Sequence, residues 1–146
     1  MRRDAFIFQR DGWFYGRRVF VLPEVPPVIS ARPLRLAADA SDSSLGSWVF
    51  DMLSFDLAEE GPRSPNDDPT FYLLKLAGCR SWREFAKSAY AVDVWDEDDI
   101  LAIGSTKRTP SNSYRNLPNP IVMHTREPSA LGEKVRDAML RSSTAR

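Results

Sequence analysis

The sequence predicts a single α+β domain spanning residues 1–146, in which a largely antiparallel sheet carries about three packed helices. Short runs of β-branched and aromatic residues, separated by turn residues, occupy residues 5–22 and 91–103 and indicate strands joined by tight turns. A helical phrase beginning Leu-Gly occurs twice, at Leu45 and at Leu131. The 42% apolar content, with 4 Trp and 8 Phe, is sufficient for one hydrophobic core.

The first part of the chain is predicted to form strands. Three apolar runs, at residues 5–8, 13–15 and 19–22, are separated by two Gly-containing segments, at residues 11–12 and 16–18. We interpret both Gly-containing segments as turns. Three prolines within residues 23–27 remove backbone donors, so this segment is predicted as a loop or a sheet edge. Alternation at residues 34–36 predicts a further short strand.

The first Leu-Gly phrase predicts a helix that begins near Leu45. Side chains able to cap its first turn precede it at residues 41–44. Helical spacing then places four apolar residues on one face, namely Leu45, Val49, Met52 and Leu53. Residues 59–69 contain three Pro, one Gly and four acidic residues, which predicts a mobile acidic loop.

The second half of the chain is predicted to contain a short helix, a hairpin and a final helix. Ser81 and Glu84 form a capping pattern, so a helix is predicted from Trp82, after an apolar stretch at residues 71–74. Strands at residues 91–95 and 100–103 flank Asp96-Glu97-Asp98-Asp99, which predicts a hairpin with an acidic tip. A loop at residues 109–120 and a strand at residues 121–123 follow. The last helix follows Ser129, with a shared face of Leu131, Val135, Ala138 and Met139.

Charge is unevenly distributed although its sum is zero. Residues 37–99 carry five Lys or Arg against fourteen Asp or Glu, and both ends of the chain are basic. A clustered negative potential attracts a basic partner over about 8–10 Å in physiological salt. Solvated acidic loops are the alternative interpretation of the same pattern.

The sequence offers no catalytic set, and we predict a protein that is not an enzyme. His124 is the single histidine and Cys79 the single cysteine, so neither has a second residue of its kind. The acidic run at residues 96–99 lacks the Gly and the distant Glu of a calcium loop, and no phosphate-binding glycine motif occurs. We therefore expect no metal and no cofactor. A small nuclease using His124 with Arg126 or a nearby acid is the enzymatic alternative.

The composition also bears on compartment and partners. No stretch approaches the roughly 18 apolar residues of a membrane span, and no signal peptide is found, so we expect a cytoplasmic protein without a membrane partner. Arginines interleaved with aromatic residues in the first 18 residues resemble a nucleic-acid surface, but the zero net charge argues against direct nucleic-acid binding.

Several motifs, taken in their order along the chain, resemble one family. They occupy residues 39–46, 81–87, 91–103, 109–118 and 131–142. In this order they resemble the immunity proteins of contact-dependent growth inhibition systems (CdiI), which bind and neutralise a cognate toxin delivered by a neighbouring bacterium. The chain departs from the family pattern at Trp48 and Phe50, where smaller residues are usual.

The resemblance implies a non-enzymatic, cytoplasmic inhibitor whose partner is a cognate toxin, the C-terminal domain of a CdiA protein. Many such toxins are nucleases with basic substrate clefts, which an acidic surface can occupy. The predicted toxin-binding residues are Asp93, Trp95, Asp96, Glu97, Asp98, Asp99, Glu59, Glu60, Asp67 and Asp68. Trp95 beside the acidic tip is interpreted as an interface anchor, with core packing as the alternative. An interaction or scaffold protein unrelated to toxins remains a second hypothesis.

Overall fold

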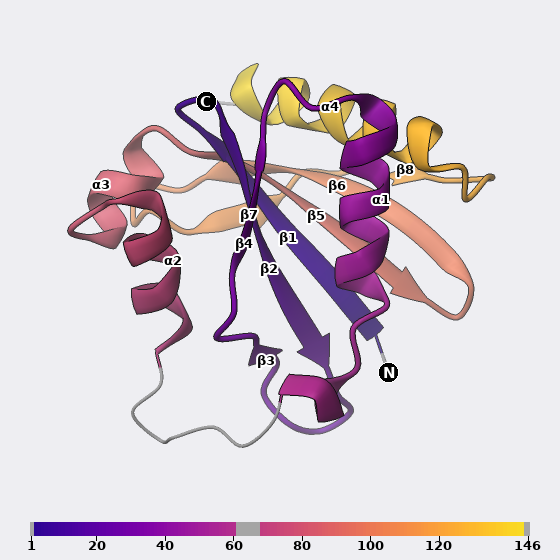
Figure 1. Cartoon of the computed structure of the whole chain (residues 1–146), viewed down its shortest axis with the longest axis horizontal. Coiled ribbons are helices and arrows are strands. Elements are labelled where there is room, and N and C mark those ends of the chain that lie inside the picture. Colours follow the sequence, from indigo (N-terminus) through magenta and orange to yellow (C-terminus); the bar gives the residue numbers. More distant parts are fainter. Residues whose placement is uncertain (1, 61–67, 145–146) are drawn as a thin grey trace.

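The computed structural model describes residues 2–60 and 68–144, and in this part of the chain an eight-stranded antiparallel sheet is combined with four α-helices (Figure 1). The strands are β1 (Arg2–Arg10), β2 (Trp13–Val21), β3 (Val28–Ile29), β4 (Leu34–Ala37), β5 (Tyr90–Glu97), β6 (Ile100–Arg108), β7 (Tyr114–Asn116) and β8 (Ile121–Val122). The helices are α1 (Asp42–Leu53), the 3-10 turn η1 (Leu57–Glu60), α2 (Pro69–Ala77), α3 (Trp82–Lys87) and α4 (Pro128–Thr144). The predicted α+β class is confirmed.

The main path of the sheet runs β3-β2-β1-β5-β6-β7, while β4 pairs with β2 and β8 with β6. The predicted turn at residues 11–12 is confirmed, because Asp11 and Gly12 both have left-handed φ values, 49° and 81°. The predicted turn at residues 16–18 is wrong, since β2 continues through Gly16. Gly16 pairs with Ile7, and a Cβ there would lie 2.5 Å from Met52 Sδ of α1. The missing side chain at Gly16 lets α1 pack closely against β2, and the strand does not turn at this residue.

One face of the sheet is covered by α1 and α4, the two helices that carry the repeated phrase. All eight apolar residues predicted to share helix faces are buried there, against side chains of β1, β2, β5 and β6 that include Ile7, Phe14, Val92, Val94 and Ile103. The capping of α1 is also confirmed, because Ser41 Oγ accepts a hydrogen bond from Ser44 N at 3.0 Å. The helix that carries the second copy of the phrase, α4, begins at Pro128, slightly before its predicted start.

The repeated glycines form a reciprocal contact where α1 and α4 cross (Figure 1). A Cβ at Gly46 would overlap the carbonyl oxygen of Pro128, at the start of α4. A Cβ at Gly132 would overlap the carbonyl oxygen of Asp42, at the start of α1. Arg136 strengthens the same junction by donating from Nε to Asp42 Oδ1 at 2.8 Å. The phrase is therefore repeated because each helix needs the same small residue at the crossing.

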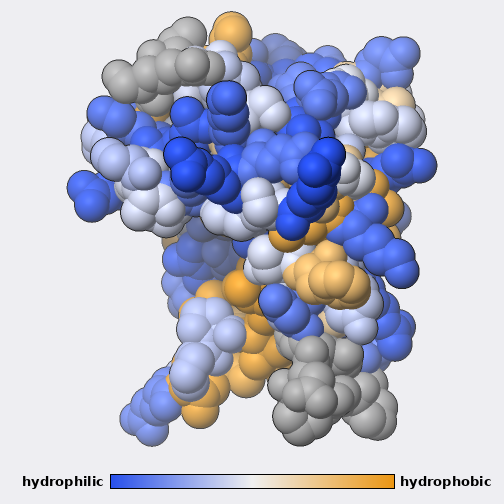
Figure 2. All heavy atoms as spheres, turned by 90° about the vertical axis from the view of Figure 1, so that its left-hand side faces the viewer, coloured by the Kyte–Doolittle hydropathy of each residue, from blue (hydrophilic) through white to orange (hydrophobic). Residues whose placement is uncertain are grey.

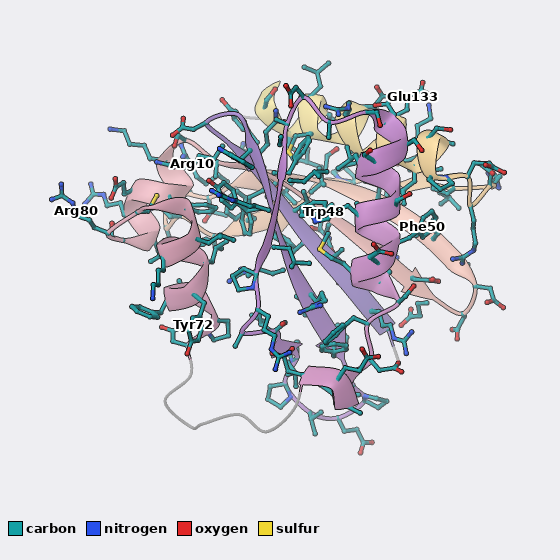
Figure 3. All side chains as sticks on the ribbon, viewed as in Figure 1. Arg10, Trp48, Phe50, Tyr72, Arg80 and Glu133 are labelled. Atoms are coloured by element: carbon teal, nitrogen blue, oxygen red, sulfur yellow. The ribbon has the colours of Figure 1, made fainter. Side chains whose placement is uncertain are left out.

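The larger residues of the first phrase fit this arrangement. Figure 3 shows Trp48 and Phe50 on opposite sides of α1, and both are partly buried against the core beneath the helix. Trp48 approaches Gly16 of β2, where an added Cβ would lie 3.0 Å from its Cη2 atom. The glycine in the strand thus provides the room that the tryptophan occupies.

The other face of the sheet carries α2, α3 and an aromatic cluster. Tyr114 of β7 lies 5.5 Å from Phe8 of β1 between ring centroids, although β5 and β6 separate these strands in the sheet order. The sheet must therefore curl so that β7 covers this face. Phe85 of α3 completes the cluster, 5.1 Å from Phe8 and 5.8 Å from Tyr15. Figure 2 views the side of the molecule that α2 and α3 form, and hydrophilic side chains dominate its upper part.

Other local predictions meet mixed outcomes. The short helix from Trp82 and its Ser81 cap are confirmed. Residues 109–120 form the predicted loop except for β7 within them. The predicted acidic loop at residues 59–69 is only partly described, and its described ends are ordered as η1 and as the start of α2. The helix α2 was predicted only as an apolar stretch.

Candidate functional site

The candidate site is the acidic end of the sheet, built on the β5–β6 hairpin. Its tip is confirmed, with Asp98 and Asp99 both in left-handed conformation at φ 51° and 63°. Glu97, Asp98 and Asp99 are exposed. Asp96 is bound bidentately by Arg126, whose Nη1 and Nη2 donate to the carboxylate at 3.0 and 3.2 Å. Only one of the four consecutive acids is therefore neutralised by an ion pair within the described residues.

Asp56 joins this acidic end from a distant part of the sequence. It lies just after α1 and is exposed, and Arg3 Nη2 donates to its Oδ1 at 2.7 Å. Arg3 stands opposite Asp96 in the β1–β5 register. The sequence alone does not assign Asp56 to this surface, because its position depends on where α1 ends against the sheet.

Trp95 lies next to the tip on the curled face of the sheet and is partly exposed. Its ring lies over β6, where a Cβ at Gly104 would approach Trp95 Cζ3 to 3.0 Å. The guanidinium of Arg2 stacks on the ring, 4.8 Å from its centroid. The ring is thus held in place by its own strand neighbours and still presents surface beside three exposed acids.

Asp93 does not contribute to this surface. Its exposed fraction is 6%, and that of Asp4, its neighbour on β1, is 7%. Burial, together with hydrogen bonding to the Asp4 carboxyl and the charge of that group, raises the pKa of Asp93 to about 8, while Arg2 and the Asn116 side chain oppose the shift. Sequence reasoning missed Arg2 and Asp4 because their partner is set by strand register.

The remaining predicted site residues are dispersed. Glu60 is buried and accepts hydrogen bonds from Ser30 Oγ and the Ala31 amide, both at 2.8 Å, so it connects η1 to the β3 region. Glu59 is exposed on η1. Asp68 caps α2 by accepting from the Thr70 amide at 3.0 Å, and Asp67 lies outside the described residues. In Figure 1 the hairpin tip, η1 and the start of α2 lie at three separate places.

Basic residues gather away from the acidic end. Arg80, Arg83 and Lys87 are exposed on α3 and just before it. Figure 1 places α3 and the hairpin tip at opposite sides of the molecule, and Figure 3 shows Arg80 projecting outward on the α3 side. The zero net charge therefore conceals two regions of opposite sign.

A cavity of about 440 Å³ opens at the other end of the same hairpin, where β5 and β6 separate. The backbone pairing of β5 with β6 ends at Val92 and Ser105. Beyond this point the Thr106 amide donates to the Ser142 hydroxyl of α4 at 2.9 Å, in place of a backbone acceptor on β5. The hydroxyls of Thr106 and Ser142 both donate to the Ala91 carbonyl oxygen, at 2.6 and 2.9 Å. Lys107 lies on the rim of this cavity and is exposed.

The residues considered for chemistry are isolated. His124 is exposed after β8 and makes no hydrogen bond or ion pair with any described residue. Burial raises the pKa of the Cys79 thiol, which disfavours the nucleophilic thiolate. Among residues 2–60 and 68–144, no three His, Cys, Asp or Glu side chains come together as metal ligands. The helices in these same ranges are too short or too polar to cross a membrane.

The fold is similar to that of a chain in a contact-dependent growth inhibition toxin and immunity complex, so the resemblance predicted from the sequence motifs is confirmed at the level of the fold. A chain of the CdiA-CT/CdiI toxin and immunity complex from Yersinia pseudotuberculosis is similar with a TM-score of 0.68 and 18% identity, over 97% of both chains. A protein of unknown function from Neisseria meningitidis, NMB0488, is similar with a TM-score of 0.76 and 16% identity, over 97% of this chain and 95% of that one. No protein-family model and no curated protein sequence matches the chain.

Proposed function

We propose that the chain is an immunity protein that binds and neutralises the C-terminal toxin domain of a CdiA protein in the bacterial cytoplasm. One observation carries the proposal: the fold is similar to that of a chain of a toxin and immunity complex over 97% of both chains. In this function the chain acts by binding and performs no chemistry. The isolation of His124 and the raised pKa of Cys79 support that view.

The acidic end of the sheet is the proposed toxin-binding surface. It consists of Trp95, Asp96, Glu97, Asp98, Asp99 and Asp56. Exposed acids at the rim of an interface accelerate association by steering, whereas an aromatic side chain near the centre slows dissociation. Trp95 is suited to the second role because its ring is already ordered by Arg2 and Gly104, so little side-chain entropy is lost on binding.

A toxin that fits this surface is a nuclease with a basic substrate cleft. Such a cleft binds phosphates through Lys and Arg, and clustered carboxylates can occupy it in place of the nucleic acid. The separation of charge between the hairpin tip and α3 favours one orientation of approach, because α3 repels the same cleft. Neutralisation then follows from exclusion of the substrate.

Co-expression tests the proposal. The CdiA C-terminal domain encoded beside this chain is induced in a host that lacks immunity, with and without the chain. We expect the chain to restore growth and to co-purify with that toxin in a 1:1 complex. The toxin domain of the Yersinia complex serves as the non-cognate control, and its toxicity should persist. Undiminished killing by the adjacent toxin, with the chain present and folded, contradicts the proposal and favours the scaffold hypothesis.

A further inference from the structure

Two buried carboxyl groups lie close together where β1 pairs with β5. Asp4 is opposite Trp95 and Phe6 is opposite Asp93, so Asp4 and Asp93 are diagonal neighbours on the same face of the sheet. Arg2 binds Asp4 bidentately, with Nε at 2.8 Å and Nη2 at 2.9 Å from the two carboxyl oxygens. The same Nη2 reaches Asp93 Oδ2 at 3.4 Å. One guanidinium group thus serves two buried acids.

The charge of this cluster is incompletely balanced. Asp93 Oδ1 is buried, and no described residue donates a hydrogen bond to it with acceptable distance and angle. Two adjacent carboxylates in a buried site repel each other and lose hydration, so a single cation leaves one negative charge uncompensated. A proton shared between the carboxyls removes the repulsion and permits a hydrogen bond between them.

Among the described residues, the elements packed around Asp93 supply no second cation to it. On β1 the charged groups beside Asp93 are Arg2 and Asp4, because Arg3 alternates to the other face and binds Asp56, and Arg10 lies at the far end of the strand. On β5 the next acid on the same face as Asp93 is Glu97, and it acts on Arg2. The strand β7 contributes the neutral Asn116 side chain, and β6 places Gly104 opposite Asp93. From β2, Arg17 points to the rings of Phe8 and Trp82, at 5.3 and 5.6 Å.

We propose that Asp4 and Asp93 share one proton at neutral pH and that this proton latches the first residues of β1 to β5. Loss of the proton leaves two buried negative charges beside one guanidinium and loosens the start of β1. Because Arg2 stacks on the Trp95 ring, we expect the fluorescence of Trp95 to change when the proton is lost. The raised pKa of Asp93, about 8, agrees with the geometry.

The sign of the pH dependence follows from proton binding. An aspartate in the unfolded chain releases its proton near pH 4, whereas Asp93 in the folded chain, with a pKa of about 8, keeps its proton to about that pH. Between these values the folded state holds the extra proton, so its stability falls as the pH rises. One extra proton corresponds to a loss of up to about tenfold in the folding equilibrium constant per pH unit.

The experiment combines NMR titration with denaturant unfolding. In the wild-type protein, the side-chain carboxyl ¹³C signal of Asp93 should titrate at least two pH units above the value near 4 of an aspartate in an unfolded chain. Asp93→Asn mimics the protonated state, so from pH 5 to pH 9 it should lose most of the decline in stability that wild type shows. The matched control Asp51→Asn, on the exposed side of α1, should keep the wild-type decline.

Two results for Asp93 would contradict the proposal, and one for Trp95 would do so as well. One is an Asp93 titration midpoint below pH 5 in the wild-type protein, which needs no variant to fold. The other is an Asp93→Asn protein whose stability declines with pH as steeply as that of the wild type. Fluorescence of Trp95, measured in a Trp13→Phe/Trp48→Phe/Trp82→Phe background, should change with the same midpoint as the carboxyl signal, and an unchanged spectrum up to pH 9 also contradicts the proposal.

Discussion

The two faces of the sheet follow different rules. The face beneath α1 and α4 is mainly aliphatic and is covered by the two helices, which meet through Gly46 and Gly132. The opposite face joins an aromatic cluster to a charged end, where Arg2, Asp4, Asp93 and Trp95 lie together. The repeated motif therefore belongs to the face that the helices cover, whereas the proposed binding residues lie on the other face and at the hairpin end of the sheet.

The largest effect is expected from the aromatic cluster. Phe85 is fully buried in edge-on contact with Phe8 and Tyr15, so Phe85→Ala should cost about 3–5 kcal/mol of unfolding free energy. Urea unfolding followed by far-UV circular dichroism measures the loss. The neighbouring exposed Lys87→Ala provides the control within the same helix. A cost for Phe85→Ala below about 1 kcal/mol would show that α3 is not part of the core.

Substitution of two tryptophans tests whether Trp95 belongs to the toxin-binding surface. Trp95→Ala should weaken toxin binding by about 2 kcal/mol or more if the ring is an interface anchor. Trp13 is the matched control, because it is also partly exposed and Arg35 stacks on it at 4.2 Å from the ring centroid. Isothermal titration calorimetry with the toxin domain compares the two. Equal affinities for Trp95→Ala and wild type would remove Trp95 from the binding surface.

The helix crossing gives a prediction with a distinctive sign. In an unconstrained helix, Gly→Ala stabilises by about 1 kcal/mol. At Gly46 the added methyl group would overlap the Pro128 carbonyl oxygen, so Gly46→Ala should instead destabilise by about 1–3 kcal/mol. Ser47→Ala, on the exposed side of the same turn, should change stability little. A Gly46→Ala protein more stable than wild type would contradict the close crossing.

The smallest effect concerns the rate of association. Reversing the tip acids with Glu97→Lys, Asp98→Lys and Asp99→Lys should slow toxin association by about tenfold at low salt, and added salt should reduce the difference. Lys107→Glu, at the cavity on the other end of the hairpin, reverses charge away from the tip and is the comparison. Stopped-flow mixing measures both. If only Lys107→Glu alters binding, the surface lies at the cavity.

Much of the helix-covered face was predictable because it depends on local periodicity. Residues such as Leu45, Val49, Leu131 and Val135 repeat at helical spacing, and their burial follows from that spacing alone. The hairpin tip was equally predictable from its composition. The interpretation of Gly16 failed because glycine signals both turns and close helix approach, and only the position of α1 decides between them.

The charged end was less predictable because it depends on pairing between distant strands. Asp93 was predicted with the exposed acids because the acidic run at residues 96–99 follows it closely, yet alternation within β5 directs it toward Asp4. Glu60 was grouped with its acidic neighbour Glu59, although Glu60 is buried at the end of η1. Composition thus identified the acidic region, whereas the packing of distant segments determined which acidic side chains are exposed and which are buried.

The central claim is that this chain neutralises a CdiA toxin by binding it, and one titration tests it most directly. Purified toxin domain is held at constant concentration while the chain is added, and both complex formation and the toxin's nucleic-acid cleavage are followed. The proposed function predicts a linear fall in cleavage that ends at one chain per toxin. Full cleavage at a several-fold excess of folded chain would contradict it.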